Sequence, residues 1–309
     1  MSIREKLPFV VLLAALALAL VASDCNGNGW NNNGFVDNPH LRAVGFADDT
    51  YVLAGQDYTI ANSADGESFL RQSVDCCGSL RAVTFDGAKW VVAGDQGVVY
   101  TSTDSANWFF QFLPTSRDMR GAAFGGSGVV PVYVLVGDDG RIVTSTNAGA
   151  WTVDSSVTNN DLNGIVWAGG LFVAVGDAGT ILTSSLGSAA WSVQSSGVDV
   201  DLRGIARGDG LFIAVGDEGT ILTSPDGVVW TVQTSGVDES LAAAAHGANT
   251  FVVVGDNGTV LSSPDGATFT PRDPDTGREL DGVTFGGGQF VAVGRNAVIR
   301  NSNDGIDWF

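Results

Sequence analysis

The sequence is dominated by one unit of about 39 residues that recurs seven times. Three landmarks mark each unit. The first is Leu41, Leu80, Met119, Leu162, Leu202, Leu241 and Leu280. The second is Gly55, Gly94, Gly137, Gly176, Gly216, Gly255 and Gly294. The third is Phe69, Trp108, Trp151, Trp191, Trp230, Phe269 and Trp308. The interval from the first landmark to the second is the same in six units, and so is the interval from the second to the third. The next unit always begins at one fixed distance after the third landmark. Such regular spacing indicates one structural element repeated.

Each unit is predicted to form four short strands. In the fifth unit, Leu211–Val215 is a continuous apolar run, which is typical of a strand covered on both faces. Trp230–Thr234 alternates apolar and polar residues, so it is expected to be the outermost strand. Leu202–Ala206 is small and contains glycine, which suits a crowded strand near an axis. Four strands per roughly 40 residues form a propeller blade. The predicted fold is all-β, a seven-bladed β-propeller with four antiparallel strands per blade.

The two ends of the sequence are expected to meet in one blade. The seventh unit stops at Trp308-Phe309 and has no fourth strand of its own. Trp30 precedes Leu41 by the same interval that separates Phe69 from Leu80, and it follows a similar Asn-Gly turn. We therefore expect the segment from Trp30 to about Val36 to be the outer strand of blade seven, within a closing strand and entry loop at 24–40. Residues 41–309 are then the seven repeats, and closure removes an open sheet edge.

Residues 1–23 are typical of a secretory signal. Arg4 and Lys6 precede Pro8–Ala22, which has no charged or strongly polar side chain and ends in small residues. This run is shorter than the roughly 20 residues that a membrane-spanning helix needs. Cys25 raises a second hypothesis, a bacterial lipoprotein, although Asp24 departs from the usual small residue before the lipidated cysteine. The expected location is therefore periplasmic, at the cell surface as a lipoprotein, or secreted.

The formal net charge of −19, with two lysines, argues against a nucleic-acid partner, because an acidic surface repels phosphate. A membrane contact is expected only through a lipid on Cys25. The protein is expected to be a monomer without a cofactor.

The turn before the third landmark is clearest at Ser224–Trp230, where Ser and Asp side chains can accept backbone N–H groups and Gly can adopt a positive φ. The residues assigned to these structural turns are Asp65, Gly66, Asp226, Gly227, Trp230, Asp265, Gly266, Asp304, Gly305 and Trp308. The corresponding turns of units two to four depart from this pattern.

At these residues the sequence resembles the Asp-box (sialidase-type, BNR-like) repeat propellers. In V-G-D-x-G-T-I followed by S-x-D-G-x-x-W it is similar to propellers of the photosystem II stability/assembly-factor type. The resemblance covers the mature chain, although the turn is one residue shorter than the usual Asp-box spacing in six units. The assembly-factor resemblance implies a non-catalytic scaffold that holds a partner protein. The sialidase resemblance implies an Arg-Ile-Pro motif, which is not present in this sequence.

Arg42, Arg81, Arg120 and Arg203 follow the first landmark and form the candidate binding set. Repeat equivalence places them at one height near the axis, where they could hold an anionic group through bidentate contacts. Alternatively, they pair with the carboxylates of the V-G-D turns, such as Asp95, Asp138 or Asp217. In unit seven Asp281 and Arg295 exchange these two positions, which favours ion pairs.

Cysteines and histidines add two further hypotheses. Cys76-Cys77 could form a vicinal disulfide or remain two reduced thiols. His40 and His246 lie in different units with no Cys or His at ligand spacing, so no metal site is expected.

Two functions are consistent with these patterns. The first is an exported non-catalytic scaffold that binds a protein or glycan through inter-blade loops such as Ser196–Asp201 and Ser235–Ser240. The alternative is a carbohydrate-active enzyme at the central mouth of the propeller, using two of the carboxylates Asp118, Asp161, Asp201 and Glu279. The lack of a bulky insertion favours the scaffold.

Overall fold

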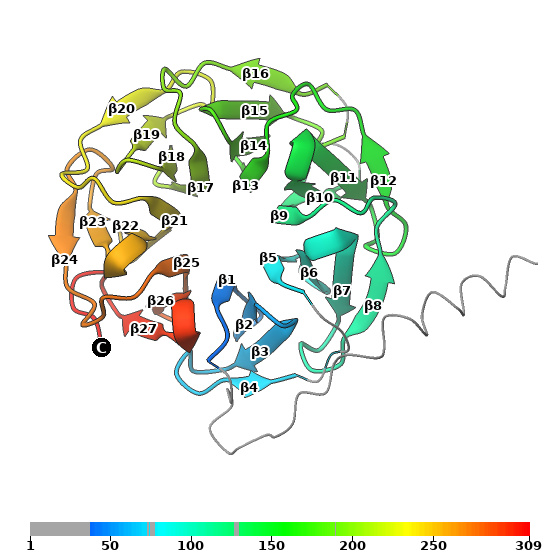
Figure 1. Ribbon diagram of the computed structural model, residues 1–309, viewed down its shortest axis with the longest axis horizontal. Helices are drawn as coiled ribbons and strands as arrows, with labels where there is room; N and C mark the ends of the chain where they lie inside the picture. Colours follow the sequence, from blue (N-terminus) through cyan, green and yellow to red (C-terminus); the bar gives the residue numbers. More distant parts are fainter. Residues whose placement is uncertain (1–37, 73, 75–77, 127–129, 189) are drawn as a thin grey trace, which may run out of the picture.

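The computed structural model describes residues 38–72, 74, 78–126, 130–188 and 190–309. Seven antiparallel sheets stand around a central axis like the blades of a propeller (Figure 1). Six sheets have four strands, and the seventh has three among the described residues. The prediction of an all-β seven-bladed propeller is confirmed. The described part of the chain contains no helix long and apolar enough to cross a membrane.

The strands follow one another from the axis to the rim within each blade. Blade one contains β1 (Leu41–Ala47), β2 (Thr50–Gly55), β3 (Thr59–Ser63) and β4 (Leu70–Arg71). Blade two contains β5 (Leu80–Phe85), β6 (Trp90–Gly94), β7 (Val98–Ser102) and β8 (Phe109–Phe112). Blade three contains β9 (Met119–Gly125), β10 (Val132–Gly137), β11 (Arg141–Ser145) and β12 (Thr152–Asp154). Blade four contains β13 (Leu162–Ala168), β14 (Leu171–Gly176), β15 (Thr180–Ser184) and β16 (Ser192–Gln194).

The remaining blades repeat this order. Blade five contains β17 (Leu202–Gly208), β18 (Leu211–Gly216), β19 (Ile221–Ser224) and β20 (Thr231–Gln233). Blade six contains β21 (Leu241–Gly247), β22 (Thr250–Gly255), β23 (Val260–Ser263) and β24 (Thr270–Arg272). Blade seven contains β25 (Leu280–Gly286), β26 (Gln289–Gly294) and β27 (Ile299–Ser302). Short 3-10 turns link the second and third strands at η1 (Asp95–Gly97), η2 (Asp138–Gly140), η3 (Asp256–Gly258) and η4 (Arg295–Ala297).

The hydrophobic core lies between neighbouring blades. The middle strands of each blade are buried on both faces, as their apolar runs predict. Val173 and Val175 of blade four, for example, form one cluster with Phe212 and Ala214 of blade five. The core is therefore a ring of blade-to-blade contacts, and each blade depends on its two neighbours.

The second landmark is glycine because the chain passes very close to it. A Cβ atom on Gly176 would lie 2.0 Å from the carbonyl oxygen of Asp161, the residue just before β13. That same oxygen accepts the N–H of Asp177 at 2.9 Å. Any side chain at Gly176 would push the entry to β13 away from the end of β14.

The turn before the third landmark forms the hydrogen bonds expected of it. Ser224 Oγ accepts the N–H of Gly227 at 2.8 Å, and Asp226 Oδ1 accepts the N–H groups of Val228 and Val229, each at 2.9 Å. Gly227 has a φ of +76°, which favours glycine. Trp230 closes the turn by donating its indole N–H to the Gly227 carbonyl at 3.1 Å.

The seam between blades seven and one is joined by backbone contacts. Ala297 donates its N–H to the carbonyl of Pro39 at 2.8 Å, just before β1 begins. Asn301 and Phe309 exchange two backbone hydrogen bonds of 3.0 Å, as the first pair of an outer strand would. The expected closing strand from Trp30 to Val36, the signal at 1–23, and the cysteines Cys25, Cys76 and Cys77 lie outside the described residues.

Candidate functional site

Every inner strand begins with a β-bulge directly after the first landmark. In blade one Leu41 pairs with Gly55, but Ala43 pairs with Ala54, so Arg42 has no ladder partner. The bulge residues are Arg42, Arg81, Arg120, Asn163, Arg203, Ala242 and Asp281. Bulges commonly redirect a side chain. Each of the seven bulge residues therefore has no partner in the strand ladder, and together they are arranged around the axis.

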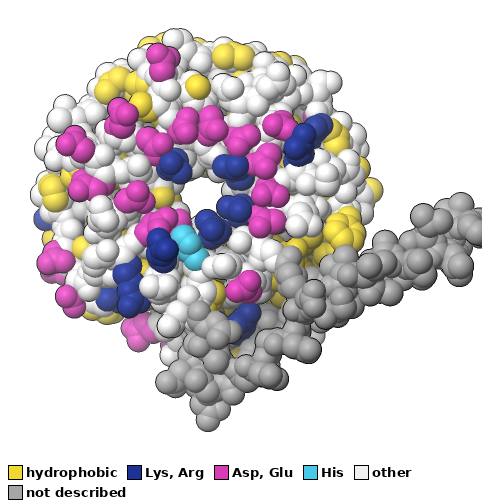
Figure 2. All heavy atoms as spheres, viewed as in Figure 1, with side chains coloured by type: hydrophobic (Ala, Val, Ile, Leu, Met, Phe, Trp, Pro, Cys, Tyr) yellow, Lys and Arg dark blue, Asp and Glu magenta, His cyan; other side chains and the backbone are white. Residues whose placement is uncertain are grey.

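Figure 2 shows the face of the ring that carries this set. Dark-blue Lys and Arg side chains line the central opening, and magenta carboxylates surround them (Figure 2). We use the term central mouth for this opening together with the seven bulge residues. Its lining combines both signs of charge, although the chain as a whole carries a net charge of −19.

Three arginines of the candidate set form ion pairs within their own blades. Arg81 Nε lies 2.6 Å from Asp95 Oδ1, and Arg120 Nε lies 2.6 Å from Asp138 Oδ1. Arg203 donates to both carboxylate oxygens of Asp217, in the bidentate geometry typical of arginine. The hydrogen bond from Arg203 holds the pKa of Asp217 below its usual value. The interpretation of these three residues as structural ion pairs agrees with the structure.

Arg120 also joins blade three to blade four. Its Nη2 lies 2.8 Å from Asp161 Oδ2, and its Nη1 donates to the side-chain oxygen of Asn163 at 3.1 Å. The other oxygen of Asp161 accepts the backbone N–H of Asp139 at 2.8 Å. Arg81 makes a longer contact of the same kind, 4.0 Å, with Asp118.

The carboxylates considered as a catalytic pair therefore have structural contacts. Asp118, Asp161 and Asp201 each accept a backbone N–H from the V-G-D turn of the preceding blade, at 2.8 to 2.9 Å. Glu279 instead contacts Arg295. Each of these four carboxylates thus connects one segment of the ring to another.

Arg42 differs from the other three arginines. Gln56 occupies the position that Asp95 occupies in blade two, so blade one supplies no carboxylate there. Among the described residues Arg42 has no hydrogen-bond or ion-pair partner, and its Nε is buried. Burial and the positive charge of Arg81 lower the pKa of Arg42, against the opposing effect of Asp281. Arg42 therefore lacks the ion pair that the other three arginines form within their own blades. Its charge is nevertheless acted on from a longer distance by Asp281, Asp95 and Glu279.

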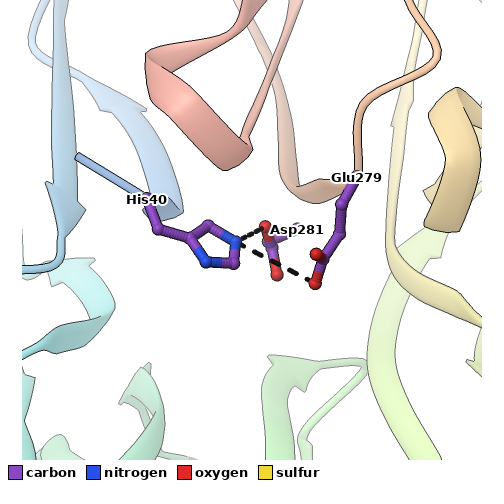
Figure 3. A group of neighbouring side chains, drawn as sticks. All are labelled: His40, Glu279 and Asp281. Atoms are coloured by element: carbon purple, nitrogen blue, oxygen red, sulfur yellow. Dashed lines mark hydrogen bonds and ion pairs between the residues drawn. The ribbon is translucent and has the colours of Figure 1, made fainter. Parts of the chain in front are cut away.

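A second group lies at the seam of the ring. Figure 3 shows His40, Glu279 and Asp281 with their polar atoms directed toward one another. His40 Nε2 hydrogen-bonds to Asp281 and lies 4.0 Å from Glu279 Oε1. Arg295 Nη1 lies 3.6 Å from the other oxygen of Glu279. The exchange of Asp281 and Arg295 in unit seven would permit an ion pair between these two residues, but Asp281 pairs with His40 across the seam and Arg295 contacts Glu279.

The sequence reasoning missed this group because residues 40 and 281 are neighbours only after the ring closes. A signal was nevertheless present. His40 directly precedes the first landmark, the position held by Asp118, Asp161, Asp201 and Glu279 in other units. The His40–Asp281 contact joins the same two positions as Arg120–Asp161, with the carboxylate at the bulge position instead of before the first landmark.

The outer strand of blade two was also overlooked. Phe109, Phe110 and Phe112 of β8 are 69%, 43% and 60% exposed. Phe110 packs against Phe112 and against the buried Tyr100. This is an exposed aromatic strip on the rim, remote from the central mouth.

Comparisons with known proteins support the architecture. No family model matches the chain, and no curated protein matches it. YCF48 from Cyanidioschyzon merolae aligns with a TM-score of 0.67 and 16% identity, covering 88% of this chain and 98% of that chain. The fold is shared. YCF48 bound to D1 peptide aligns with a TM-score of 0.68 and 17% identity, over 89% and 95% of the two chains.

The WD40 repeats of RRP9 align with a TM-score of 0.65 and 10% identity, covering 83% of this chain and 88% of that chain. Identities this low establish the propeller fold alone. The Asp-box resemblance stays a prediction.

Proposed function

We propose that this protein is a non-catalytic scaffold that binds an acidic segment of a partner protein at the central mouth. Arg42 carries the proposal, because a guanidinium with a buried, unsatisfied Nε loses hydration without gaining a protein acceptor. A carboxylate arriving from a partner would not reach the buried Nε, so it would pair with the terminal nitrogens of the guanidinium in charge-assisted hydrogen bonds. Arg81 lies close enough to act on the charge of Arg42, although Arg81 is itself paired with Asp95.

The paired arginines support this role by holding the mouth in shape. Arg81, Arg120 and Arg203 are each fixed to a carboxylate of their own blade. Arg120 is fixed to blade four as well. A lining that is already ordered costs little entropy when a partner binds. Arg42 would then be the anchor, in a rigid frame that its neighbours provide.

A protein partner is favoured over a glycan by the chemistry and by one structural comparison. A neutral sugar has no carboxylate to satisfy Arg42, whereas an Asp or Glu side chain does. A propeller of the same fold, YCF48, has been solved bound to D1 peptide, so this architecture can hold a peptide. That comparison is an analogy at the level of the fold. An acidic glycan also carries carboxylates, so the experiment must distinguish it from an acidic peptide.

We also propose that the scaffold acts outside the cytoplasm. The supporting observation is the basic, apolar and small-residue order of residues 1–23, with Cys25 directly beyond it. Fractionation of the producing cell and intact-mass measurement test this. A mass that includes a diacylglyceryl group at Cys25 supports the lipoprotein form, and a mass that begins near Ser23 supports the free form. An uncleaved cytoplasmic protein contradicts export.

The binding proposal is tested with fluorescently labelled acidic peptides that contain Asp-Glu pairs, alongside versions in which Asn and Gln replace them. Anisotropy should report salt-sensitive binding of the acidic peptides alone. Arg42→Gln should weaken that binding at least tenfold. The matched control is Arg207→Gln, because Arg207 lies at the far end of β17 and stacks over the Phe212 ring at 4.3 Å.

Three results would contradict the proposal. If the acidic and amide peptides bind equally well, the carboxylate is not what the protein recognises. If Arg42→Gln binds the acidic peptides as the wild type does, Arg42 is not the anchor. Preference for an acidic oligosaccharide such as an oligogalacturonate assigns the mouth to glycans, and release of reducing sugar from that panel would favour the enzyme.

A further inference from the structure

We infer that His40, Glu279 and Asp281 bind a divalent transition-metal cation, with Zn²⁺ the best match, at the seam between blades seven and one. The inference does not require the proposed scaffold function, because its three ligands are different side chains from Arg42, which nevertheless acts on Asp281 and Glu279. It concerns the side chains drawn in Figure 3.

The donor atoms are suitable in type and number. One imidazole nitrogen and two carboxylate oxygens lie within 4.8 Å of one another. Zinc sites with three protein ligands and a water in the fourth position are common, and imidazole nitrogen and carboxylate oxygen are both zinc ligands. Zinc ligands at ~2.0–2.2 Å from the ion require donor atoms closer together than 4.8 Å. The side chains are partly exposed at the mouth and can therefore close around an ion.

The charge pattern of the ring explains why a cation is needed here. In blades two, three and five the bulge residue is an arginine, so a positive charge is built in beside the carboxylates. In blade seven that residue is Asp281, and Glu279 adds a second negative charge. Arg295 contacts Glu279 from its own blade. An ion bound by His40 would therefore add positive charge at Asp281, the bulge position that an arginine holds in blades two, three and five.

Arg295 contacts one of the three proposed metal ligands, Glu279. Its Nη1 contacts Glu279 Oε2 at 3.6 Å, while Glu279 Oε1 is directed toward His40. A contact of this kind fixes a ligating carboxylate from behind, as outer-shell residues do in many metal sites. Arg42 is the other cation that acts on Asp281 and Glu279, and a metal must compete with it.

The location gives the bound ion a mechanical effect. His40 directly precedes β1, and Glu279 and Asp281 lie at the start of blade seven, so an ion would join the first repeat to the last. In the described residues this seam otherwise depends on contacts such as Ala297–Pro39. An ion that binds only the closed ring stabilises it by mass action.

The test uses the protein purified without a histidine tag and stripped with chelator. Calorimetry with ZnCl₂ should give one site per chain, and ZnCl₂ should raise the melting temperature by several degrees. Cobalt chloride should give the visible absorption of a bound ion in a low-symmetry site. His40→Gln and Asp281→Asn should each abolish the zinc-dependent rise.

His246→Gln is the matched control. His246 Nε2 contacts Asp209 at 3.1 Å, but no second carboxylate joins this pair in the part of the chain that is described. This variant should keep the full response to zinc. Circular dichroism of the metal-free variants shows whether each still folds. If His40→Gln does not fold, Asp281→Asn provides the test of the zinc response. A wild-type protein without a zinc response, or a response that survives in both seam variants, overturns the inference.

Discussion

Arg42 has no carboxylate partner among the described residues because Gln56 stands in blade one where Asp95 stands in blade two. The pairs Arg81–Asp95, Arg120–Asp138 and Arg203–Asp217 show what this position does when it is acidic. One residue difference therefore separates an arginine that is ion-paired within its own blade from one that is not. The four arginines occupy equivalent positions in the repeat, and only the presence or absence of a carboxylate partner in the same blade distinguishes Arg42 from the other three.

Gln56→Asp should turn Arg42 into a fourth structural arginine. The new carboxylate would compete with any bound acidic peptide, so we expect the affinity for the peptides described above to fall roughly tenfold. The melting temperature should stay the same or rise slightly, because a partly exposed ion pair contributes little. Anisotropy and thermal melts measure both effects. Wild-type peptide affinity in this variant would show that Arg42 is not the anchor.

The aspartates of the turns before the third landmark should make the fold sensitive to acid. The backbone N–H groups of Val229 and Val228 hold the pKa of Asp226 below its usual value of 3.8, and the same cause acts on Asp65, Asp265 and Asp304. The unfolded chain then takes up protons first as the pH falls. The stability from these groups is complete above about pH 4 and is lost as the pH falls below it.

Asp226→Asn tests this cause. Asn147 makes the equivalent hydrogen bonds in blade three, to the N–H groups of Gly149 and Ala150 at 2.8 and 2.9 Å, so an amide fits the turn. The variant should fold and should lose less stability than the wild type between pH 5 and pH 2. Thermal melts across that range measure the slope. Parallel slopes would mean that the Asp226 carboxylate does not contribute.

Ala148 should be better replaced by glycine. Its φ of +54° lies in the left-handed region, at the position where Gly66, Gly227, Gly266 and Gly305 stand in other blades. Relieving a left-handed alanine gains about 1–2 kcal/mol, and losing a buried methyl group costs about 0.8 kcal/mol. Ala148→Gly should therefore raise the melting temperature by about 1–3 °C. Ala150→Gly, at an exposed site without a positive φ, should give no rise.

Deleting residues 24–38 should destabilise the whole ring. The Ala297–Pro39 hydrogen bond brings the entry to β1 alongside blade seven, as expected if a closing strand precedes it. Without that strand the edge of β27 would stay open beyond its contact with Phe309. Thermal melts should show a loss of several degrees, partly restored by a peptide of residues 24–38 added to the truncated protein. An unchanged melting temperature would contradict the closure model.

The sequence was sufficient for the fold because each unit repeats the same local signals. The predicted strand Leu211–Val215 became β18 at Leu211–Gly216, and Leu202–Ala206 became the start of β17. The Asp partners of Arg81, Arg120 and Arg203 could also be inferred, since both members belong to one unit.

Three structural features could not be predicted from the sequence of a single unit. The bulge at Arg42 is hidden inside the regular interval between the first and second landmarks, because every unit carries the same extra residue. The His40–Asp281 contact exists only between the ends of a closed ring. The exposure of Phe109, Phe110 and Phe112 depends on β8 being an edge, whereas their apolar side chains alone would predict burial.

The bulges at the start of the inner strands have a consequence for how such a protein can change. Because the residue after the first landmark pairs with nothing in its ladder, its side chain can be exchanged without disturbing strand register. Arg, Asn, Ala and Asp already occupy that position in one ring. The seven units thus provide seven positions around one opening where the side chain can change while strand register is kept. New ligand preferences could therefore arise on an unchanged framework wherever the residue, unlike Arg120, has no partner in the next blade.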